Sequence, residues 1–388
     1  MPTTNGSQAN AGQSRTLRSR LRWIYICALH CTGLLALAKR WVHSQGAIVL
    51  TFHRILSDHA AAQTYSPAGL VMRERTFESL LKFVSDSYQI FDVHTGFSAG
   101  KAARTPVAIT FDDGWEDNAS TAFPIASALK IPFTIFVCPE LMDMAEPFWP
   151  EKVVGLFRSA GNSTDSIRQI SRSLMSCGYP EWAYAVASTN GSRCDILIER
   201  LKSLSSEERR RVLQSLLSGR IPQGQSGNGT VDRTVSWSQA RQLRNAGINF
   251  GSHTQHHEIL PAVQRERAEQ EVKDSRAAIE EHLGTCSTFS YPNGDFSKEV
   301  QEIVASCGYK RAFINCPGVW REQDDPFLIP RINLSEGTVT GPNGHFSPRA
   351  FEYRVFWNAF VNGKRRVRPA FQSETIPNSS TVEKFNTL

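Results

Sequence analysis

The first 45 residues of this 388-residue sequence contain no aspartate or glutamate, although both are common in the rest of the chain. The segment 1–45 therefore carries the whole formal charge of +6, and residues 46–388 sum to about zero. A nucleic-acid-binding domain carries its basic excess on the folded body, so the balanced body argues against a nucleic-acid partner. The basic arm instead indicates either association with a membrane surface through residues 15–40 or a targeting role. The charges of this arm come from Arg15, Arg18, Arg20, Arg22, Lys39 and Arg40.

The chain also lacks an apolar run of the ~20 residues that a membrane-spanning helix usually needs. Its longest candidate, WIYICALHCTGLLALA at 23–38, is shorter and lies between basic residues. Three interpretations remain open: a signal peptide with a cleavage site resembling A-x-A at 36–38, a short uncleaved anchor, or a helix lying on a membrane or packed on the protein. His30 and Thr32 within the run disfavour the first two.

None of the eight cysteines forms a C-x-x-C pair, and no internal repeat is visible. Several of them, such as Cys138 and Cys286, stand in or beside apolar runs. This pattern predicts free, buried thiols in a reducing compartment. A disulfide framework is unnecessary for a chain long enough to form one large α/β domain with additions.

Short apolar runs rich in β-branched residues recur from Gly46 onward, with helix-like stretches between them. This alternation predicts an α/β fold with a parallel sheet covered on both faces. Helices are predicted at 237–246, with Ser236 and Gln239 as a capping box, and at 266–283, ended by Gly284. The predicted strands are 47–52, 107–111, 131–137, 248–252, 288–291 and 311–314.

The rhythm breaks between 145 and 235, where a polar and mainly helical stretch follows the aromatic opening FWPEK. We interpret this stretch as an insertion between two strands of the domain. The predicted organisation is a basic arm with a short apolar helix at 1–45, a main domain at 46–341, and a C-terminal helix with a disordered tail at 342–388. Residues 1–14 are also predicted to be disordered.

Two adjacent carboxylates, Asp112 and Asp113, follow the strand at 107–111 and precede Gly114. Neighbouring side chains of a strand point to opposite faces, but a glycine turn at the strand end lets both reach one pocket. Close carboxylates repel each other unless a cation lies beside them. An Asp-Asp-Gly turn on the surface is the alternative.

His253 and His257 follow the strand at 248–252 and are four residues apart, which places both rings on one face if the segment is a helical turn. Two imidazoles and one carboxylate form a known ligand set for a catalytic transition metal. A solvated histidine-rich loop is the alternative. His256 faces away from the other two in this geometry.

Two further clusters follow predicted strands. Tyr291-Pro292-Asn293-Gly294 predicts a tight turn whose exposed N–H groups can stabilise an oxyanion, and His53 follows the first strand. Each segment alone is better explained as structural. The strand ends of a parallel α/β fold meet at one face, however, so four such clusters predict a single site there.

The motifs TFDDGWEDN (110–118), GSHTQHH (251–257) and FSYPNG (289–294) resemble those of the polysaccharide deacetylases of the NodB-homology, carbohydrate esterase 4 type. The resemblance covers about residues 46–335 and implies an irregular (β/α) barrel, often with seven strands. LTFHRI (50–55) and LIPRINL (328–334) resemble segments of the circularly permuted branch that includes exopolysaccharide poly-N-acetylglucosamine deacetylases.

The resemblance implies a role for each matching residue. Asp113, His253 and His257 correspond to the metal ligands, and Asp112 corresponds to the general base. The metal is expected to be zinc, with cobalt, nickel or iron(II) as alternatives. His53 corresponds to the general acid of the permuted branch, and the backbone N–H of Asn293 to an oxyanion donor.

Substrate contacts and supporting bonds are assigned in the same way to Thr254, Tyr291, Pro292 and Trp115. Trp115, Trp237 and Phe148 are candidates for stacking on sugar rings, with core or rim packing as the alternative. His345 is a substitute candidate for the acid. An arginine that orients the base often stands at the position of Ser290 in the family, and it is absent there.

The resemblance predicts a bacterial, metal-dependent hydrolase that removes N-acetyl groups from N-acetylhexosamine units of an exopolysaccharide, either membrane-associated or cytoplasmic, with an exported form as a further option. An O-acetyl esterase or another amide hydrolase with the same site is the first alternative. A non-catalytic glycan-binding or assembly subunit is the second. The oligomeric state is left open.

Overall fold

The computed structural model describes residues 20–97, 102–144, 148–161, 163–189, 193–218 and 231–362. The segments expected to be disordered, 1–14 and the tail beyond 362, lie outside this part of the chain. All eight cysteines lie inside it and are free thiols.

The centre of the molecule is a sheet in which every strand pairs in parallel, in the order β10-β9-β8-β7-β6-β5-β1-β11. Its main strands are almost completely buried because they are built from apolar residues and are covered on both faces. They are β1 (Ile48–Phe52), β5 (Pro106–Phe111), β6 (Thr134–Val137), β7 (Asn249–Ser252), β8 (Thr288–Ser290) and β9 (Arg311–Ile314).

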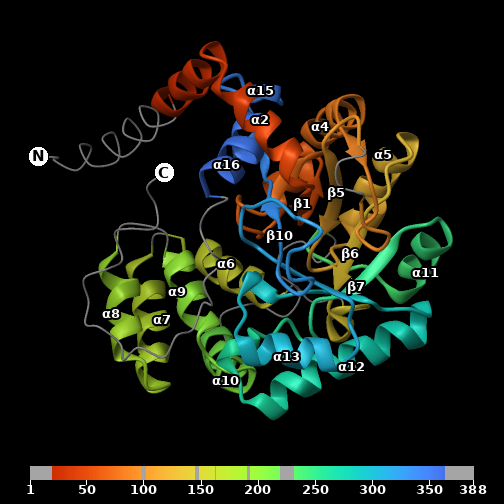
Figure 1. The fold of residues 1–388 in the computed structure, drawn as a ribbon. Helices are drawn as coiled ribbons and strands as arrows, with labels where there is room; N and C mark the ends of the chain where they lie inside the picture. The colour runs from red at the N-terminus through yellow and green to blue at the C-terminus, as the bar shows by residue number, and fades with distance from the viewer. Residues whose placement is uncertain are drawn as a thin grey trace, which may run out of the picture.

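The segment 329–333 closes this sheet into a barrel. Its first part, β10 (Ile329–Pro330), pairs with β9, and its second part, β11 (Ile332–Asn333), pairs with β1 at the opposite edge. The two short strands follow each other with only Arg331 between them, so one stretch of chain joins both edges. The predicted irregular (β/α)7 barrel with a helical insertion is confirmed (Figure 1).

The remaining strands are short. β4 (Gln89–Ile90) pairs with β5, and β2 (Arg54–Leu56) pairs with β3 (Val71–Arg73) in a separate two-stranded sheet. The connections of the barrel contain α3 (Asp58–Gln63), α4 (Glu74–Ser87), η1 (Asn118–Ala122), α5 (Phe123–Ala128), η2 (Pro139–Leu141), α11 (Trp237–Asn245), η3 (Leu260–Ala262), α12 (Arg265–Leu283), η4 (Pro292–Gly294), α13 (Lys298–Ser306) and α14 (Glu336–Val339).

The helix signals of the sequence are confirmed in detail. α11 begins with the expected capping box, in which the Ser236 hydroxyl accepts from the backbone N–H of Gln239 and the Gln239 side chain accepts from that of Ser236. α12 ends at Gly284, whose positive φ of 83° is the left-handed conformation typical of a helix C-terminus.

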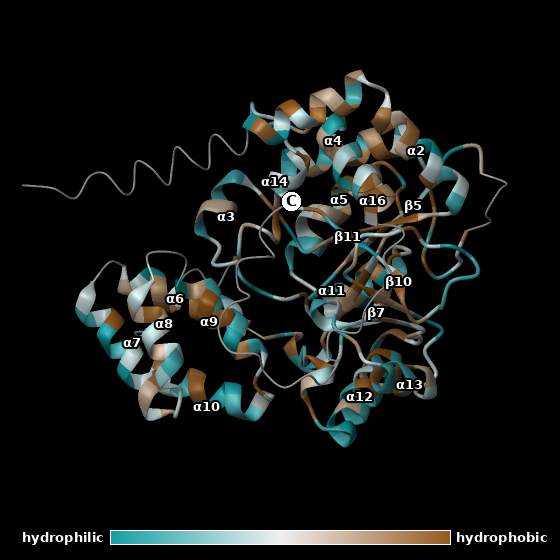
Figure 2. Ribbon diagram, turned by 60° about the vertical axis from the view of Figure 1, so that its left-hand side comes forward, coloured by the Kyte–Doolittle hydropathy of each residue, from teal (hydrophilic) through white to brown (hydrophobic). Residues whose placement is uncertain are grey.

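The first five α-helices between β6 and β7 have a hydrophobic core of their own. Side chains such as Val153, Ile170, Leu197 and Val212 are fully buried against one another. In Figures 1 and 2 these helices form a lobe beside the barrel. They are α6 (Trp149–Ala160), α7 (Thr164–Ser176), α8 (Pro180–Ser188), α9 (Arg193–Lys202) and α10 (Ser206–Leu217).

The apolar run near the N-terminus is divided between two helices instead of forming the expected single one. The helix Arg20–Cys31 meets α2 (Leu34–Gln45) at an angle of 72°. Gly33 lies at the bend with a positive φ of 77°. Among the described residues, no single helix has the length and apolarity to cross a bilayer, and only this bent pair meets both criteria together.

The C-terminal part packs beside these two helices. It consists of α15 (Pro348–Glu352), η5 (Tyr353–Trp357) and α16 (Asn358–Asn362), which follow one another without interruption. Tyr25 contacts Tyr353 and Trp357 edge to face, and Lys39 forms an ion pair of 2.9 Å with Glu352. The expected last helix is therefore present.

Candidate active site

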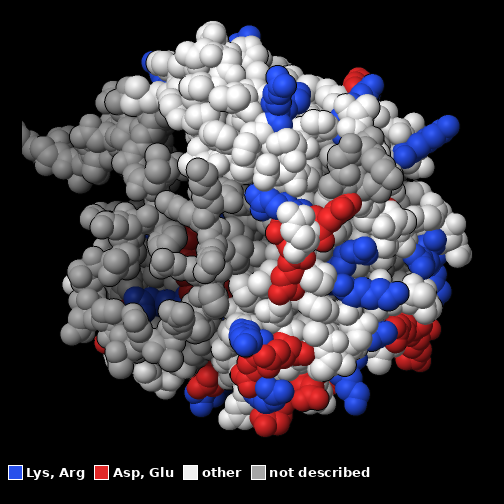
Figure 3. Space-filling view, viewed as in Figure 1, with Lys and Arg blue, Asp and Glu red and all other residues white. Residues whose placement is uncertain are grey.

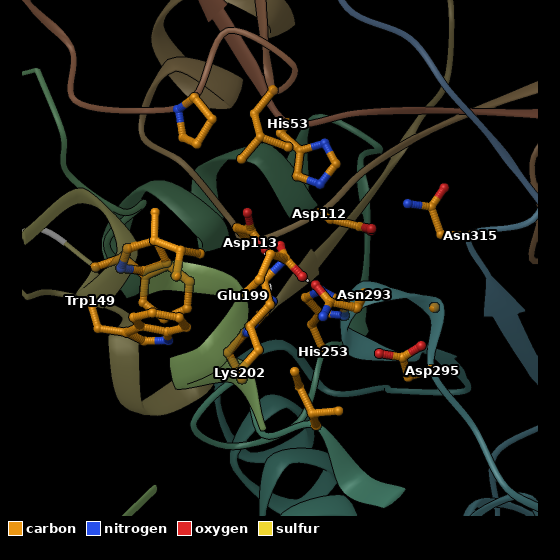
Figure 4. Close-up of a pocket in the computed structure, with 18 of the residues that line it drawn as sticks. His53, Asp112, Asp113, Trp149, Glu199, Lys202, His253, Asn293, Asp295 and Asn315 are labelled. Atoms are coloured by element: carbon orange, nitrogen blue, oxygen red, sulfur yellow. Dashed lines mark hydrogen bonds and ion pairs between the residues drawn. The ribbon is translucent and has the colours of Figure 1, made fainter. Parts of the chain in front are cut away.

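The four clusters that follow predicted strands meet at the carboxyl ends of the barrel strands. They line a cavity of about 490 Å³ that contains His53, Asp112, Asp113, His253, His257 and Asn293 in its wall. This volume lies within the roughly 300–1,000 Å³ of small-molecule sites. Figure 4 shows Asp112 and Asp113 in the middle of the cavity, below His53 and beside His253.

The two aspartates reach the same cavity because the chain turns sharply after β5. β5 ends at Phe111, and the positive φ values of Asp113 (70°) and Gly114 (66°) turn the chain directly after Asp112. A side chain at Gly114 would collide with Val137 on β6, which explains glycine at this position. Both carboxylates line the cavity, as the glycine turn predicted.

His253 and His257 approach each other through a loop, and the expectation of a helical turn was wrong. Residues 253–257 contain no helix, and both Thr254 and His257 have positive φ values, 66° and 59°. Of six described non-glycine residues with positive φ, four belong to the site: Asp113, Thr254, His257 and Asn293. Such strained backbone persists only where the surrounding structure enforces it, and it is concentrated here.

Asp113, His253 and His257 form a compact cluster of possible metal ligands. One donor atom of each residue lies within 4.8 Å of the others. The Oδ1 atom of Asp113 lies 3.6 Å from Nε2 of His253 and 3.4 Å from Nε2 of His257. The other oxygen of Asp113 accepts a hydrogen bond of 3.1 Å from the Trp115 indole.

The protonation of His253 fits a metal ligand. Its Nδ1 atom donates to the carbonyl oxygen of Ser290 at 2.7 Å, so in the neutral ring the lone pair is on Nε2, facing Asp113. Burial lowers the pKa of His253 to about 4, which keeps the ring neutral at neutral pH. A lone pair and a carboxylate that face each other are best accommodated by a cation between them.

Asp113 is ionised in the same environment. Burial acts to raise the pKa of its carboxyl, but a hydrogen bond from His257 and the nearby charge of His53 outweigh burial and hold that pKa well below its usual range. The donor set of one carboxylate and two imidazoles is therefore suited to a divalent transition metal with open coordination positions.

Asp112 is held by Arg331, a residue that the sequence analysis missed. The guanidinium donates to both carboxylate oxygens, at 2.7 and 2.6 Å, and also to the Ser290 hydroxyl at 2.8 Å. Burial acts to raise the pKa of Asp112, but the charge of Arg331 and its hydrogen bonds have the larger effect, so the net shift of this pKa is downward. Arginine is absent at position 290, and Arg331, between β10 and β11, supplies the contact to Asp112.

His53 lies at the end of β1 and is 9% exposed. Its Nδ1 atom is buried and has no hydrogen-bond partner among the described residues. Its carbonyl oxygen accepts a hydrogen bond of 2.8 Å from the Asn118 side chain, which fixes the backbone. The His53 ring therefore lines the cavity that also contains Asp112 and Asp113, and its buried Nδ1 atom has no partner among the described residues.

The turn after β8 places Asn293 on the opposite wall. Asn293 and Gly294 have positive φ values of 59° and 82°, and the turn packs directly against Asn315. A side chain at Gly294 would collide with the backbone of Asn315, so only glycine permits this approach.

The four residues assigned to substrate contacts lie behind the cavity wall. Trp115, Thr254, Tyr291 and Pro292 are buried and are not among the lining residues. The Thr254 hydroxyl accepts from the backbone N–H of Glu258 at 3.0 Å and so braces the histidine loop. In this structure their contacts support the site from within the protein.

Of the remaining candidate residues, one lines the cavity and the others lie away from it. Phe148 lines the cavity and contacts the His257 ring edge to face, with centroids 4.9 Å apart. Trp237 stacks on His282 away from the cavity, and His345 is exposed outside it. His256 forms an ion pair of 2.7 Å with Glu271 and points away from the cluster.

The helical insertion supplies one wall of the cavity, which the sequence alone did not indicate. Figure 4 shows Trp149, Glu199 and Lys202 on the side opposite Asn293, Asp295 and Asn315. Arg209 on α10 lies over the Trp149 ring at 5.0 Å and forms an ion pair of 3.1 Å with Glu258, next to His257. The insertion is thus attached to the histidine loop.

A buried polar network attaches the insertion at a second point. Arg54 is 0% exposed and forms ion pairs with Asp117 at 2.7 Å and Asp232 at 2.8 Å. It also donates to the Ser66 hydroxyl at 2.7 Å, and this hydroxyl donates to Glu151 on α6 at 2.9 Å. Burial raises the pKa of Glu151 to about 8.

The strand ends of this parallel barrel thus carry a His₂Asp cluster, which is a ligand set of catalytic transition metals, beside an arginine-bound aspartate. Residues 99–173 and 216–312 match the family model described as polysaccharide deacetylase. Over these residues, which contain its three motifs, the chain is similar to this family. No curated protein matches the sequence.

Several solved structures are similar to the chain. The deacetylase PplD of Streptococcus pyogenes, in complex with acetate, has 16% identity and a TM-score of 0.47, covering 74% of this chain and 92% of its own. IcaB from Ammonifex degensii has 17% identity and a TM-score of 0.47, covering 81% and 98%. A de-N-acetylase from Aggregatibacter actinomycetemcomitans has 16% identity and a TM-score of 0.47, covering 77% and 97%.

Proposed function

We propose that this protein is a metal-dependent hydrolase that removes N-acetyl groups from N-acetylhexosamine units of a glycan in exopolysaccharide biosynthesis. The observation that carries the proposal is the cluster of Asp113, His253 and His257 beside the arginine-bound Asp112. The family match supports a deacetylase, and the cavity at the strand ends provides room for a sugar unit.

A divalent cation held by Asp113, His253 and His257 would acidify a water molecule and polarise the acetamide carbonyl. Asp112 accepts the proton of the attacking water, and Arg331 keeps its carboxylate ionised and fixed in orientation. The backbone N–H of Asn293 donates to the developing oxyanion from the opposite wall. His53 donates a proton to the departing amine, so the products are a free amino sugar and acetate.

The test is a comparison of acetate release from three substrates: poly-β-1,6-N-acetylglucosamine, chitooligosaccharides and an O-acetylated glycan that lacks N-acetyl groups. We expect release from an N-acetylated glycan and not from the O-acetylated one. Release from the O-acetylated glycan alone would make the protein an esterase. If the metal-loaded protein binds a glycan but releases acetate from none of the three substrates, it is a binding subunit.

A further inference from the structure

The two helices at residues 20–45, here called the N-terminal hairpin, are apolar on two faces. Their inner face is buried against the body of the protein, and Ala38 and Val42 belong to the main hydrophobic core. The Arg22 guanidinium donates to the carbonyl oxygen of Gly337 at 3.2 Å, and Lys39 pairs with Glu352. The hairpin is thus an integral part of the folded body. The buried side chains of the inner face are Ile26, Leu29, Leu35, Ala38 and Val42.

The outer face of the hairpin is also apolar and remains largely exposed, although Tyr25 on this face contacts Tyr353 and Trp357. Five of the nine large apolar side chains that are exposed in the described part of the chain lie here: Leu21 (56%), Ile24 (63%), Tyr25 (46%), Leu34 (40%) and Leu37 (55%). In the first helix, the positions 21, 24, 25 and 28 follow the spacing of one helix face. Soluble proteins seldom expose such a contiguous stripe without a binding function.

All charged residues of the hairpin itself are basic. The hairpin contains no aspartate or glutamate, and Arg20 and Arg40 are exposed. In Figure 3, the surface at the top of the molecule, where Figure 1 places the hairpin, is white with scattered blue. Figure 2 shows brown segments alternating with other colours along the helices at this end. An apolar stripe with basic residues beside it complements the anionic surface of a bilayer.

We propose that the outer face of the N-terminal hairpin docks the protein on an anionic lipid bilayer. Ile24 and Leu37 enter the interface between headgroups and acyl chains, while Arg20 and Arg40 contact the acidic headgroups. The inner face remains packed on the body, so the hairpin lies in the plane of the membrane surface and does not cross it. The bend of 72° between its helices is compatible with this placement. This inference does not depend on the proposed enzymatic activity.

The test is sedimentation of the full-length protein with vesicles. We expect binding to vesicles of phosphatidylglycerol and phosphatidylethanolamine, and weak binding to pure phosphatidylcholine. Replacing two outward apolar side chains, in Ile24→Glu/Leu37→Glu, lowers the binding constant at least roughly tenfold, because each loses burial in the bilayer. Replacing the charges, in Arg20→Gln/Arg40→Gln, lowers it roughly fivefold per arginine and reduces its salt dependence.

A matched control places the same substitutions elsewhere. Met175 and Tyr184 on the insertion are 56% and 74% exposed, so Met175→Glu/Tyr184→Glu is expected to bind vesicles like the unmodified protein. Absence of binding, or equal binding by the Ile24→Glu/Leu37→Glu variant, would overturn the proposal. Resistance of bound protein to alkaline carbonate extraction would indicate a spanning segment instead. Dimerisation that Ile24→Glu abolishes would show that a second copy covers the face.

Discussion

Arg331 donates hydrogen bonds to both carboxylate oxygens of Asp112, although 219 residues separate the two in sequence. The arginine lies between the two short strands that close the sheet, so barrel closure and orientation of the proposed base depend on the same segment. Arg331 is a positioning residue, because it acts on the reaction through Asp112.

The first prediction concerns this pair. Arg331→Lys keeps the charge but loses the two parallel hydrogen bonds, so kcat falls roughly 10- to 100-fold, as is typical of residues that orient catalytic groups. KM and bound metal per chain remain close to those of the unmodified enzyme. Arg311→Lys is the matched control, because Arg311 begins β9 and binds the carbonyls of Val93 and His94 instead. Equal losses of kcat in both variants would show that only barrel stability is affected.

The second prediction separates proton transfer from metal binding. Asp112→Asn preserves the shape of the side chain but removes the base, so turnover falls at least ~100-fold. Metal content is largely unchanged, because Asp113, His253 and His257 are intact. The measurement is acetate release together with metal analysis of the same preparation. Near-normal turnover would remove Asp112 from the role of base.

The third prediction tests His53 as the acid. His53→Ala lowers kcat by roughly 100-fold and alters the alkaline limb of the pH profile, because the departing amine loses its proton donor. His59→Ala, at an exposed position on α3, is the control and leaves both unchanged. An unaltered rate and pH profile in His53→Ala would transfer the acid role to another group or to water.

The fourth prediction follows from the raised pKa of Glu151. Its carboxyl has a pKa of about 8 in the folded protein, well above that of an exposed glutamate, so between about pH 5 and pH 8 the folded state retains a proton that the unfolded state has lost. The free energy of unfolding therefore falls with rising pH across this window, by up to about 1.4 kcal/mol per pH unit from this group.

Glu151→Gln removes this titration, so urea unfolding of the variant should depend less on pH between 5 and 8 than that of the unmodified protein. Glu181→Gln, at an exposed position in the first turn of α8, serves as the control and should keep the original dependence. An identical pH dependence in all three proteins would show that Glu151 is not protonated in the fold.

The barrel was predictable from sequence because its strands are continuous apolar runs that end in polar clusters. These runs gave the positions of β1, β5, β7 and β9 almost to the residue. The capping box of α11 was equally legible, because its interactions are local. Local patterns also predicted that Asp112 and Asp113 share a cavity.

Contacts between distant segments were not predictable in the same way. Arg331 was overlooked because nothing in LIPRINL reveals that the arginine meets Asp112; a lone arginine within an otherwise apolar strand was the available signal. The loop at 253–257 was mistaken for a helical turn because strained backbone at Thr254 and His257 depends on surrounding packing. The wall formed by the insertion likewise depends on tertiary contacts, such as that of Arg209 with Glu258.

The most direct test of the central claim is acetate release from poly-β-1,6-N-acetylglucosamine, measured as the chelator-treated protein is titrated with zinc. We predict that the rate rises in proportion to bound metal and saturates near one ion per chain. Asp113→Ala is expected to bind the metal weakly and to release little acetate. Full activity of the metal-free protein, or of Asp113→Ala, would show that the reaction does not depend on this metal site.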